Sequence, residues 1–245
     1  MVQRGCGGGA VARRYDIPII FDNVSRVMVL GEMCYGIGRR HRNFICVNVG
    51  YGSGADIIVD GKLLLGPVGM AGEFGHITLD KDSKIQCDCG NYGCLEALAS
   101  GNAIAKVVRV ELGGVQTNAL TGMCGGDLNK ITAEIVAAAA KLGDTYAWGL
   151  FTLAAEYLGV GITGLINLFS PEAVVIGGGV VKAGDILFDN VRKIVSTRAL
   201  NKITRDVTIM PATFGMEAAV MGAVALILNK LLNCNLIEED SVSRS

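Results

Sequence analysis

One stretch of this chain reads Gly72-Glu73-Phe74-Gly75-His76 and then Cys87-Asp88-Cys89-Gly90-Asn91-Tyr92-Gly93-Cys94-Leu95-Glu96. It contains one of the two histidines and three of the eight cysteines of the 245-residue sequence. Tetrahedral zinc takes sets of three cysteines and one histidine, and four protein ligands leave no position open for water. The spacing therefore predicts a structural Zn²⁺ ion with four ligands, which are His76, Cys87, Cys89 and Cys94.

Other interpretations of these cysteines remain open. Free thiols are common in protein cores, so the cysteines could be ordinary buried residues. A disulfide is disfavoured, because closely spaced cysteines of the C-x-C type rarely meet disulfide geometry. No signal peptide is recognised, and eight cysteines without one indicate a reducing, cytoplasmic location.

The composition predicts a globular protein with a sizeable core. Hydrophobic residues make up 51% of the chain and charged residues 18%, which argues against disorder. The formal net charge of -1 argues against a large nucleic-acid surface. The long apolar segment Ile131–Phe169 is interrupted by charged residues and glycines, so we expect no membrane span.

Strand and helix patterns alternate along the chain, which is typical of an α/β fold. The helix Thr145–Phe169 is apolar almost all round, and we expect it to be buried. Asp60-Gly61 is a hairpin turn signal between two short strands. The predicted strands are Ile17–Phe21, Asn43–Val49, Ala55–Val59, Lys62–Leu65, Ala173–Ile176 and Val207–Pro211. The other predicted helices are Ser25–Tyr35, Leu95–Leu112 with a break near Ser100, Leu128–Leu142, Asp185–Arg198 and Ala218–Leu232.

The pattern G-E-x-G-H followed by C-x-C-G-x-x-G-C-L-E resembles the signature of the ROK family of repressors and sugar kinases. The resemblance extends from about Asp16 to about Leu228. It implies an actin-like, hexokinase-like ATPase fold, in which two α/β lobes close on a sugar. We expect the chain to be truncated at its N-terminus. Residues 1–40 would then be a remnant of the first lobe, and residues 41–215 a second lobe with the zinc loop and sugar pocket. Residues 216–245 would form a terminal helix and a polar tail.

The resemblance also implies a sugar site. Carboxylates and an amide suit a polyol, because each carboxylate accepts hydrogen bonds from two neighbouring hydroxyls. Ordinary surface polarity and support of the zinc ligands are the alternative roles for such residues. The residues carried over by the resemblance are Asn23, Glu73, His76 and Glu96.

A sugar kinase needs a carboxylate that takes the proton of the attacking hydroxyl. The resemblance implies an aspartate at the position of Val24, and valine cannot accept a proton. Asp22 is the one nearby substitute, and in an extended segment it would point to the same side as Val24. We therefore predict no catalytic residue.

Two glycine-rich turns resemble the nucleotide-binding turns of ROK kinases. Gly50, Gly52 and Gly54 would permit an amide nest for phosphate, although Tyr51 would crowd it. A plain hairpin is the alternative reading. Gly177, Gly178 and Gly179 follow a predicted strand, where tight strand-to-helix packing without a ligand is the favoured reading.

Two functions follow from these observations. The favoured hypothesis is a sugar-responsive ROK transcriptional regulator, which binds a hexose or related sugar without phosphorylating it. Its DNA-binding module would lie outside this chain. The alternative is an ATP-dependent sugar kinase of the glucokinase type, which would use ATP and Mg²⁺. A fragment without activity is a third hypothesis. We expect a cytoplasmic homo-oligomer whose partner is a small-molecule sugar and which has no contact with membranes.

Overall fold

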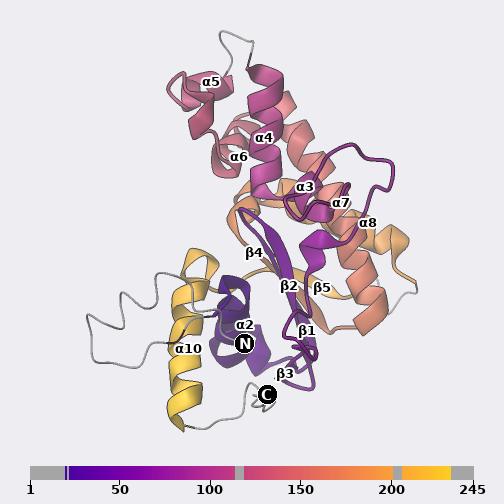
Figure 1. Ribbon diagram of the computed structural model, residues 1–245, viewed down its shortest axis with the longest axis vertical. Helices are drawn as coiled ribbons and strands as arrows, with labels where there is room; N and C mark the ends of the chain where they lie inside the picture. Colours follow the sequence, from indigo (N-terminus) through magenta and orange to yellow (C-terminus); the bar gives the residue numbers. More distant parts are fainter. Residues whose placement is uncertain (1–19, 21, 114–118, 201–205, 233–245) are drawn as a thin grey trace.

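The computed structural model describes residues 20, 22–113, 119–200 and 206–232 (Figure 1). The predicted strand Ile17–Phe21, apart from Ile20, lies outside these ranges, and so does the polar tail. Ile20 itself belongs to no regular element.

Five strands form one mixed sheet in the order β3-β2-β1-β4-β5. The strands β1, β2 and β3 pair antiparallel, whereas β1, β4 and β5 pair parallel. Asp60 and Gly61 both have positive φ angles, 53° and 78°, as a two-residue hairpin turn between β2 and β3 requires. The strands are β1 Phe44–Val49, β2 Ser53–Val59, β3 Lys62–Leu63, β4 Ala173–Gly177 and β5 Thr208–Pro211. All five were predicted, and β3 ends two residues earlier than expected.

Both faces of the sheet are covered, and alternate residues of β1 show this. Ile45 and Val47 pack into a large core formed with the helices that follow the zinc stretch. Phe44 and Cys46 point to the other face and pack into a second core beneath the first and last described helices. Burial on both sides explains why β1 and β4 consist mostly of consecutive apolar residues. The helices of the large core are α3 Leu95–Ala99, α4 Gly101–Leu112, α6 Ala133–Lys141, α7 Thr145–Phe169 and α8 Asp185–Arg198.

The second face is covered by two helices from opposite ends of the described chain, α2 Val24–Tyr35 and α10 Ala218–Leu232. Figure 1 shows them side by side, in indigo and yellow. Glycines at the crossing let the backbones approach closely. A Cβ atom on Gly222 would collide with the carbonyl oxygen of Val27, and one on Gly31 would lie 3.1 Å from the Ala218 carbonyl oxygen.

The helix predictions are largely confirmed, with two differences. The expected break separates α3 from α4, where the Ser100 side chain accepts a hydrogen bond from the Ala103 amide and begins a new helix. The single helix predicted over Leu128–Leu142 is wrong. Thr132 caps α6 in the same way, so only a short 3₁₀ turn precedes it. Helix α5, Ala119–Met123, was not predicted. The 3₁₀ turns are η1 Ile37–Arg39, η2 Phe74–His76, η3 Leu128–Lys130, η4 Gly179–Ala183 and η5 Gly215–Glu217.

The long helix α7 has the predicted bounds, but the expectation that it is buried all round is wrong. One face, which includes Phe151 and Ile162, lies in the large core, whereas Trp148 and Leu153 on other faces are about half exposed. The helix is long and apolar enough to cross a membrane, yet half of its most apolar 18-residue segment is buried inside the protein. Since the core helix of a soluble protein has these same properties, α7 does not indicate a membrane span.

Candidate functional site

A cavity of about 340 Å³ lies where the N-terminus of α2, the β1–β2 hairpin, the loop before η2 and the start of α3 meet. All four residues predicted to contact sugar line this cavity, although they are up to 73 positions apart in sequence. Val24 lines it as well. The four residues are Asn23, Glu73, His76 and Glu96.

Asn23 is positioned by its role as the N-cap of α2. Its side-chain oxygen accepts a hydrogen bond from the Ser25 amide at 2.8 Å. Among the described residues, no partner takes a hydrogen bond from its side-chain nitrogen, which is therefore the group left for a ligand. Because the helix begins at Val24, the segment is not extended through Val24, and Asp22 and Val24 are not related as residues of one strand.

Val24 occupies the first turn of α2, and 60% of its surface is exposed. Its side chain offers neither a proton acceptor nor a hydrogen-bond partner to the cavity. Asp22 is not free to replace it, because its carboxylate pairs with Arg26 at 2.9 Å and also accepts a hydrogen bond from the Asn23 amide. Arg26 is held on its other side by the Gly69 carbonyl oxygen at 3.1 Å.

Glu73 and His76 come from the short turn η2, which a glycine places against β2. Gly72 has a φ of 92°, and a Cβ atom there would collide with the Ala55 carbonyl oxygen. The two nitrogens of His76 face different groups. Nε2 lies 3.9 Å from the Glu73 carboxylate, and Nδ1 lies 3.7 Å from Cys87 Sγ. One imidazole therefore contacts both the cavity and the cysteine cluster.

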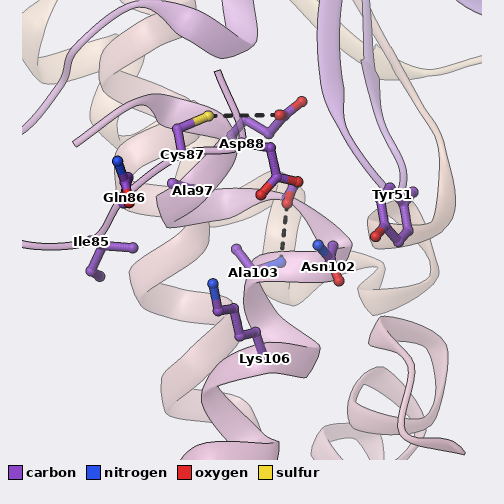
Figure 2. Close-up of a pocket in the computed structure, with 11 residues that line it drawn as sticks. Tyr51, Ile85, Gln86, Cys87, Asp88, Ala97, Asn102, Ala103 and Lys106 are labelled. Carbon is purple, nitrogen blue, oxygen red and sulfur yellow. Dashed lines mark hydrogen bonds between the residues drawn. The ribbon is translucent and has the colours of Figure 1, made fainter. Parts of the chain in front are cut away.

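Glu96 joins the hairpin to the cysteine cluster. One carboxylate oxygen accepts a hydrogen bond from the Ser53 amide at 2.8 Å, and the other lies 3.8 Å from Cys87 Sγ. The second contact is one of the dashed lines in Figure 2. Gly52 leaves room for this arrangement, since a Cβ atom there would lie 2.5 Å from the Glu96 carboxylate. The glutamate therefore fixes the hairpin relative to α3.

Four side chains converge in the loop between η2 and α3, with all their ligand atoms within 4.8 Å of one another. They are His76, Cys87, Cys89 and Cys94, the predicted zinc ligands. Gly93 allows the tight turn, since it has a φ of 65° and a Cβ atom there would collide with the Asp80 carbonyl oxygen. The described cysteines form no disulfide. Three thiols and an imidazole at this separation fit the donor set of a tetrahedral zinc site.

The two glycine-rich turns are engaged within the protein. In the first, the Gly50 amide donates to the Gly52 carbonyl oxygen at 2.9 Å, and the Ser53 amide is taken by Glu96. In the second, Gly178 has a φ of 92°, and a Cβ atom there would collide with the Val49 carbonyl oxygen at the end of β1. Close packing alone therefore accounts for Gly178.

Tyr51 and Glu96 line both the main cavity and a smaller one of about 50 Å³. Figure 2 shows the smaller cavity, with Tyr51 on the opposite side from Ile85 and Gln86. Lys106 of α4 also lines it. The tyrosine side chain is 80% exposed, and the expectation that it crowds a phosphate at the first glycine-rich turn stays a prediction.

Sequence reasoning missed Asp56 and Arg26, which also line the main cavity. Burial raises the pKa of Asp56 to about 6. Arg26 opposes this increase, whereas the negative charges of Asp22 and Glu73 add to it. The signal was present in the sequence, because Asp56 interrupts the otherwise apolar strand Ala55–Val59. An acidic residue within such a strand is costly unless it has a use.

Comparisons with known proteins place this architecture in one family. The sequence model of the family described as "ROK family" matches residues 8–230. A glucokinase of Halalkalibacterium halodurans is 38% identical over 84% of this chain and 62% of the relative. A xylose repressor of Caldicellulosiruptor bescii is 30% identical over 91% of this chain and 55% of the relative. The chain thus spans roughly three fifths of the length of these two proteins.

Solved structures agree with the sequence comparisons. A ROK family glucokinase from Streptomyces griseus, in complex with glucose and AMPPNP, has a TM-score of 0.78 and 32% identity. The aligned region covers 89% of this chain and 70% of the glucokinase chain. A ROK family transcriptional regulator, a homologue of the E. coli MLC protein, has the same TM-score and identity. The aligned region covers 94% of this chain and 56% of the regulator chain.

The mixed sheet, its two helical layers and the cavity define a protein of the hexokinase-like α/β class. The chain belongs to the ROK family, and the predicted resemblance is confirmed. Relatives of both kinds, repressors and glucokinases, are similar to it. Similarity by itself therefore does not separate a regulator from a kinase.

Proposed function

We propose that the chain is the sugar-binding part of a ROK-family regulator, which binds a hexose or related sugar without phosphorylating it. The cavity is of ordinary size for a small-molecule site and is lined by polar groups from four separate elements. Asn23, Glu73, His76 and Glu96 would hydrogen-bond the sugar hydroxyls. The printed names of relatives, glucokinase and xylose repressor, make glucose and xylose the first sugars to test.

Val24 is the observation that carries the choice of a regulator. Phosphoryl transfer to a hydroxyl needs a proton acceptor within hydrogen-bond reach, and Val24 supplies none. Asp22, the fallback, is occupied by Arg26. General-base catalysis contributes about 10²–10⁴-fold to rate, so its loss would leave a binding protein rather than an efficient kinase.

A structural zinc ion completes the proposed site. His76, Cys87, Cys89 and Cys94 would hold it, and its role would be to fix the loop between η2, which Glu73 precedes, and α3, which carries Glu96. Because His76 contacts both the cysteines and Glu73, ordering the metal loop would also order the cavity wall. The ion would perform no chemistry on the sugar.

An ATP-dependent sugar kinase is the second candidate, and the similarity to glucokinases favours it. In that case ATP and Mg²⁺ would bind near the turns of Gly50, Gly52 and Gly54 and of Gly177, Gly178 and Gly179. The internal hydrogen bonds of the first turn and the close packing of Gly178 weigh against this candidate.

The remaining parts of the proposal concern context. DNA would be bound through a module that is not part of this chain, and the folded protein would be a cytoplasmic homo-oligomer. The division into residues 1–40, 41–215 and 216–245 also stays a proposal.

Calorimetry with D-glucose and D-xylose tests the proposed function, together with a coupled assay for ADP release in the presence of ATP and Mg²⁺. We expect binding of at least one sugar and no sugar-dependent ADP release. Glu73→Ala should weaken binding about tenfold or more, because hydrogen bonds to a charged group contribute about 1.5–3 kcal/mol. Glu156→Ala, on the exposed side of α7, is the control. Turnover at about 1–100 s⁻¹, the ordinary range of kinases, would refute the regulator proposal.

A further inference from the structure

Asp56 is a carboxylate that the fold places beside the ligand cavity and does not use. It lies on β2 opposite Cys46, whose side chain belongs to the core beneath α2 and α10. Side chains directly opposite each other in a sheet share a face, so Asp56 points to the α2 side. It lines the same cavity as Asn23 and Glu73.

No described residue forms a hydrogen bond or an ion pair with the Asp56 carboxylate. Arg26, the one lysine or arginine that lines the cavity among the described residues, contacts Asp22 at 2.9 Å and the Gly69 carbonyl oxygen at 3.1 Å, and its buried Nε has no partner there. A half-buried carboxylate without a partner destabilises the folded protein. Groups of this kind are characteristic of functional sites, where a ligand supplies the missing partner.

The charges around the cavity limit the kind of ligand that suits it. Among the described residues that line it, Asp56, Glu73 and Glu96 are acidic, and Arg26 is the one lysine or arginine. Because Asp22 already neutralises Arg26, the cavity has an excess of hydrogen-bond acceptors and negative charge. A ligand rich in hydroxyl or amine donors satisfies these acceptors, whereas an anionic ligand is repelled.

We propose that Asp56 is a ligand-binding, specificity-determining residue of this cavity. Its carboxylate accepts a hydrogen bond from a hydroxyl or amine of the sugar. It thereby selects uncharged or amine-bearing sugars and rejects anionic ones such as sugar phosphates. The inference rests on the proposed sugar-binding function and names the class of sugar.

The test compares binding of D-glucose, D-xylose, D-glucosamine and glucose 6-phosphate by calorimetry on the full chain. The variants are Asp56→Asn, which preserves size, and Asp56→Ala. Asp60→Asn is the matched control, because Asp60 lies four residues along at the exposed hairpin turn and outside the cavity. We expect the wild-type protein to bind at least one uncharged or amine-bearing sugar more tightly than glucose 6-phosphate. Both Asp56 variants should weaken that binding about tenfold or more, while Asp60→Asn leaves it unchanged.

A thermal midpoint measured on each variant separates a binding role from a structural one. If Asp56 serves the ligand, Asp56→Asn loses affinity while its midpoint at pH 7 stays the same or rises. Binding by Asp56→Asn within threefold of wild type would overturn the inference and leave the proposed function intact. Equal affinity of the wild type for glucose 6-phosphate and glucose would do the same. If none of the sugars binds, the proposed function fails and the inference fails with it.

Discussion

At the scale of single residues, the cavity combines groups with opposite effects on stability. Asn23 and Glu96 stabilise the fold. Asn23 caps α2, and Glu96 accepts a hydrogen bond from the Ser53 amide at 2.8 Å. Asp56 does the reverse, since a half-buried carboxylate without a partner favours unfolding. Retaining such a residue at the expense of stability is typical of sites that bind ligands.

Asp56→Asn should therefore stabilise the protein at pH 7. The pKa of Asp56 is about 6 in the folded state, against its ordinary value of 3.8, which applies to the unfolded chain. The folded protein holds this proton more tightly, so wild-type stability falls as the pH rises between about 4 and 6. Above that window the penalty is complete, about 1–3 kcal/mol. Denaturant unfolding of both proteins from pH 4 to 7 should show a difference that grows with pH.

Asp60→Asn again provides the control, with no stability difference expected across this range. A difference between Asp56→Asn and wild type that stays constant with pH would contradict the assigned ionisation of Asp56.

At the scale of elements, the loop between η2 and α3 links the cysteine cluster to the cavity. Its regular structure within the described residues is limited to isolated bridges, such as Thr78 with Cys94. The loop nevertheless follows directly on His76 of η2 and leads into α3, which carries Glu96, so its order controls two groups of the cavity wall. A bound metal would supply the order that secondary structure does not.

Replacing Cys89 by serine should remove the metal and loosen this loop. We expect one zinc per wild-type chain by elemental analysis, and well under one in Cys89→Ser. The thermal midpoint should fall, because structural zinc contributes folding free energy directly. Sugar affinity should fall in parallel, since His76 and Glu96 both contact Cys87.

Cys124→Ser tests whether any cysteine change has these effects. Cys124 is buried and contacts the Thr121 carbonyl oxygen at 3.4 Å, away from the cluster. This variant should keep its zinc. A wild-type protein that is stable, binds sugar and contains no metal would exclude the zinc assignment.

At the scale of the whole molecule, the two ends of the described chain meet on one face of the sheet. Helices α2 and α10 cross at Gly31 and Gly222, and Glu32 adds a second link. The Glu32 carboxylate is fully buried and accepts hydrogen bonds from the Thr213 amide and hydroxyl at 2.6 and 2.7 Å. Because α2 begins at the cavity, these contacts position Asn23 and Val24.

Gly222→Ala should destabilise this crossing by about 1–3 kcal/mol, because the new methyl group would collide with the Val27 carbonyl oxygen and force the helices apart. Gly164→Ala on α7 is the matched control, since a Cβ atom there meets nothing within 4 Å. Alanine is the better helix former, so this variant should be unchanged or up to about 1 kcal/mol more stable. Denaturant unfolding measures both, and equal effects of the two changes would exclude the proposed close contact.

The sequence by itself determined the features that depend on short separations. The four cysteine-cluster residues lie within one loop, so their spacing was enough to bring them together. The hairpin at Asp60-Gly61, the break at Ser100 and the bounds of α7 follow from local turn chemistry, capping and hydrophobic pattern, and all were predicted. The ROK resemblance carried the four sugar-site residues, which the structure does bring to one cavity.

Only the tertiary structure decided what else lines that cavity. Asp56 and Arg26 are 30 positions apart, and they come together because α2 packs on the face of β2 that carries Asp56. Asn23 caps a helix that begins at Val24, so the extended geometry that would place Asp22 and Val24 on the same side does not occur. The one-sided burial of α7 was likewise invisible in a sequence that is apolar on nearly every side. In each case the outcome depends on which surfaces pack together, and packing between distant segments leaves no local pattern to read.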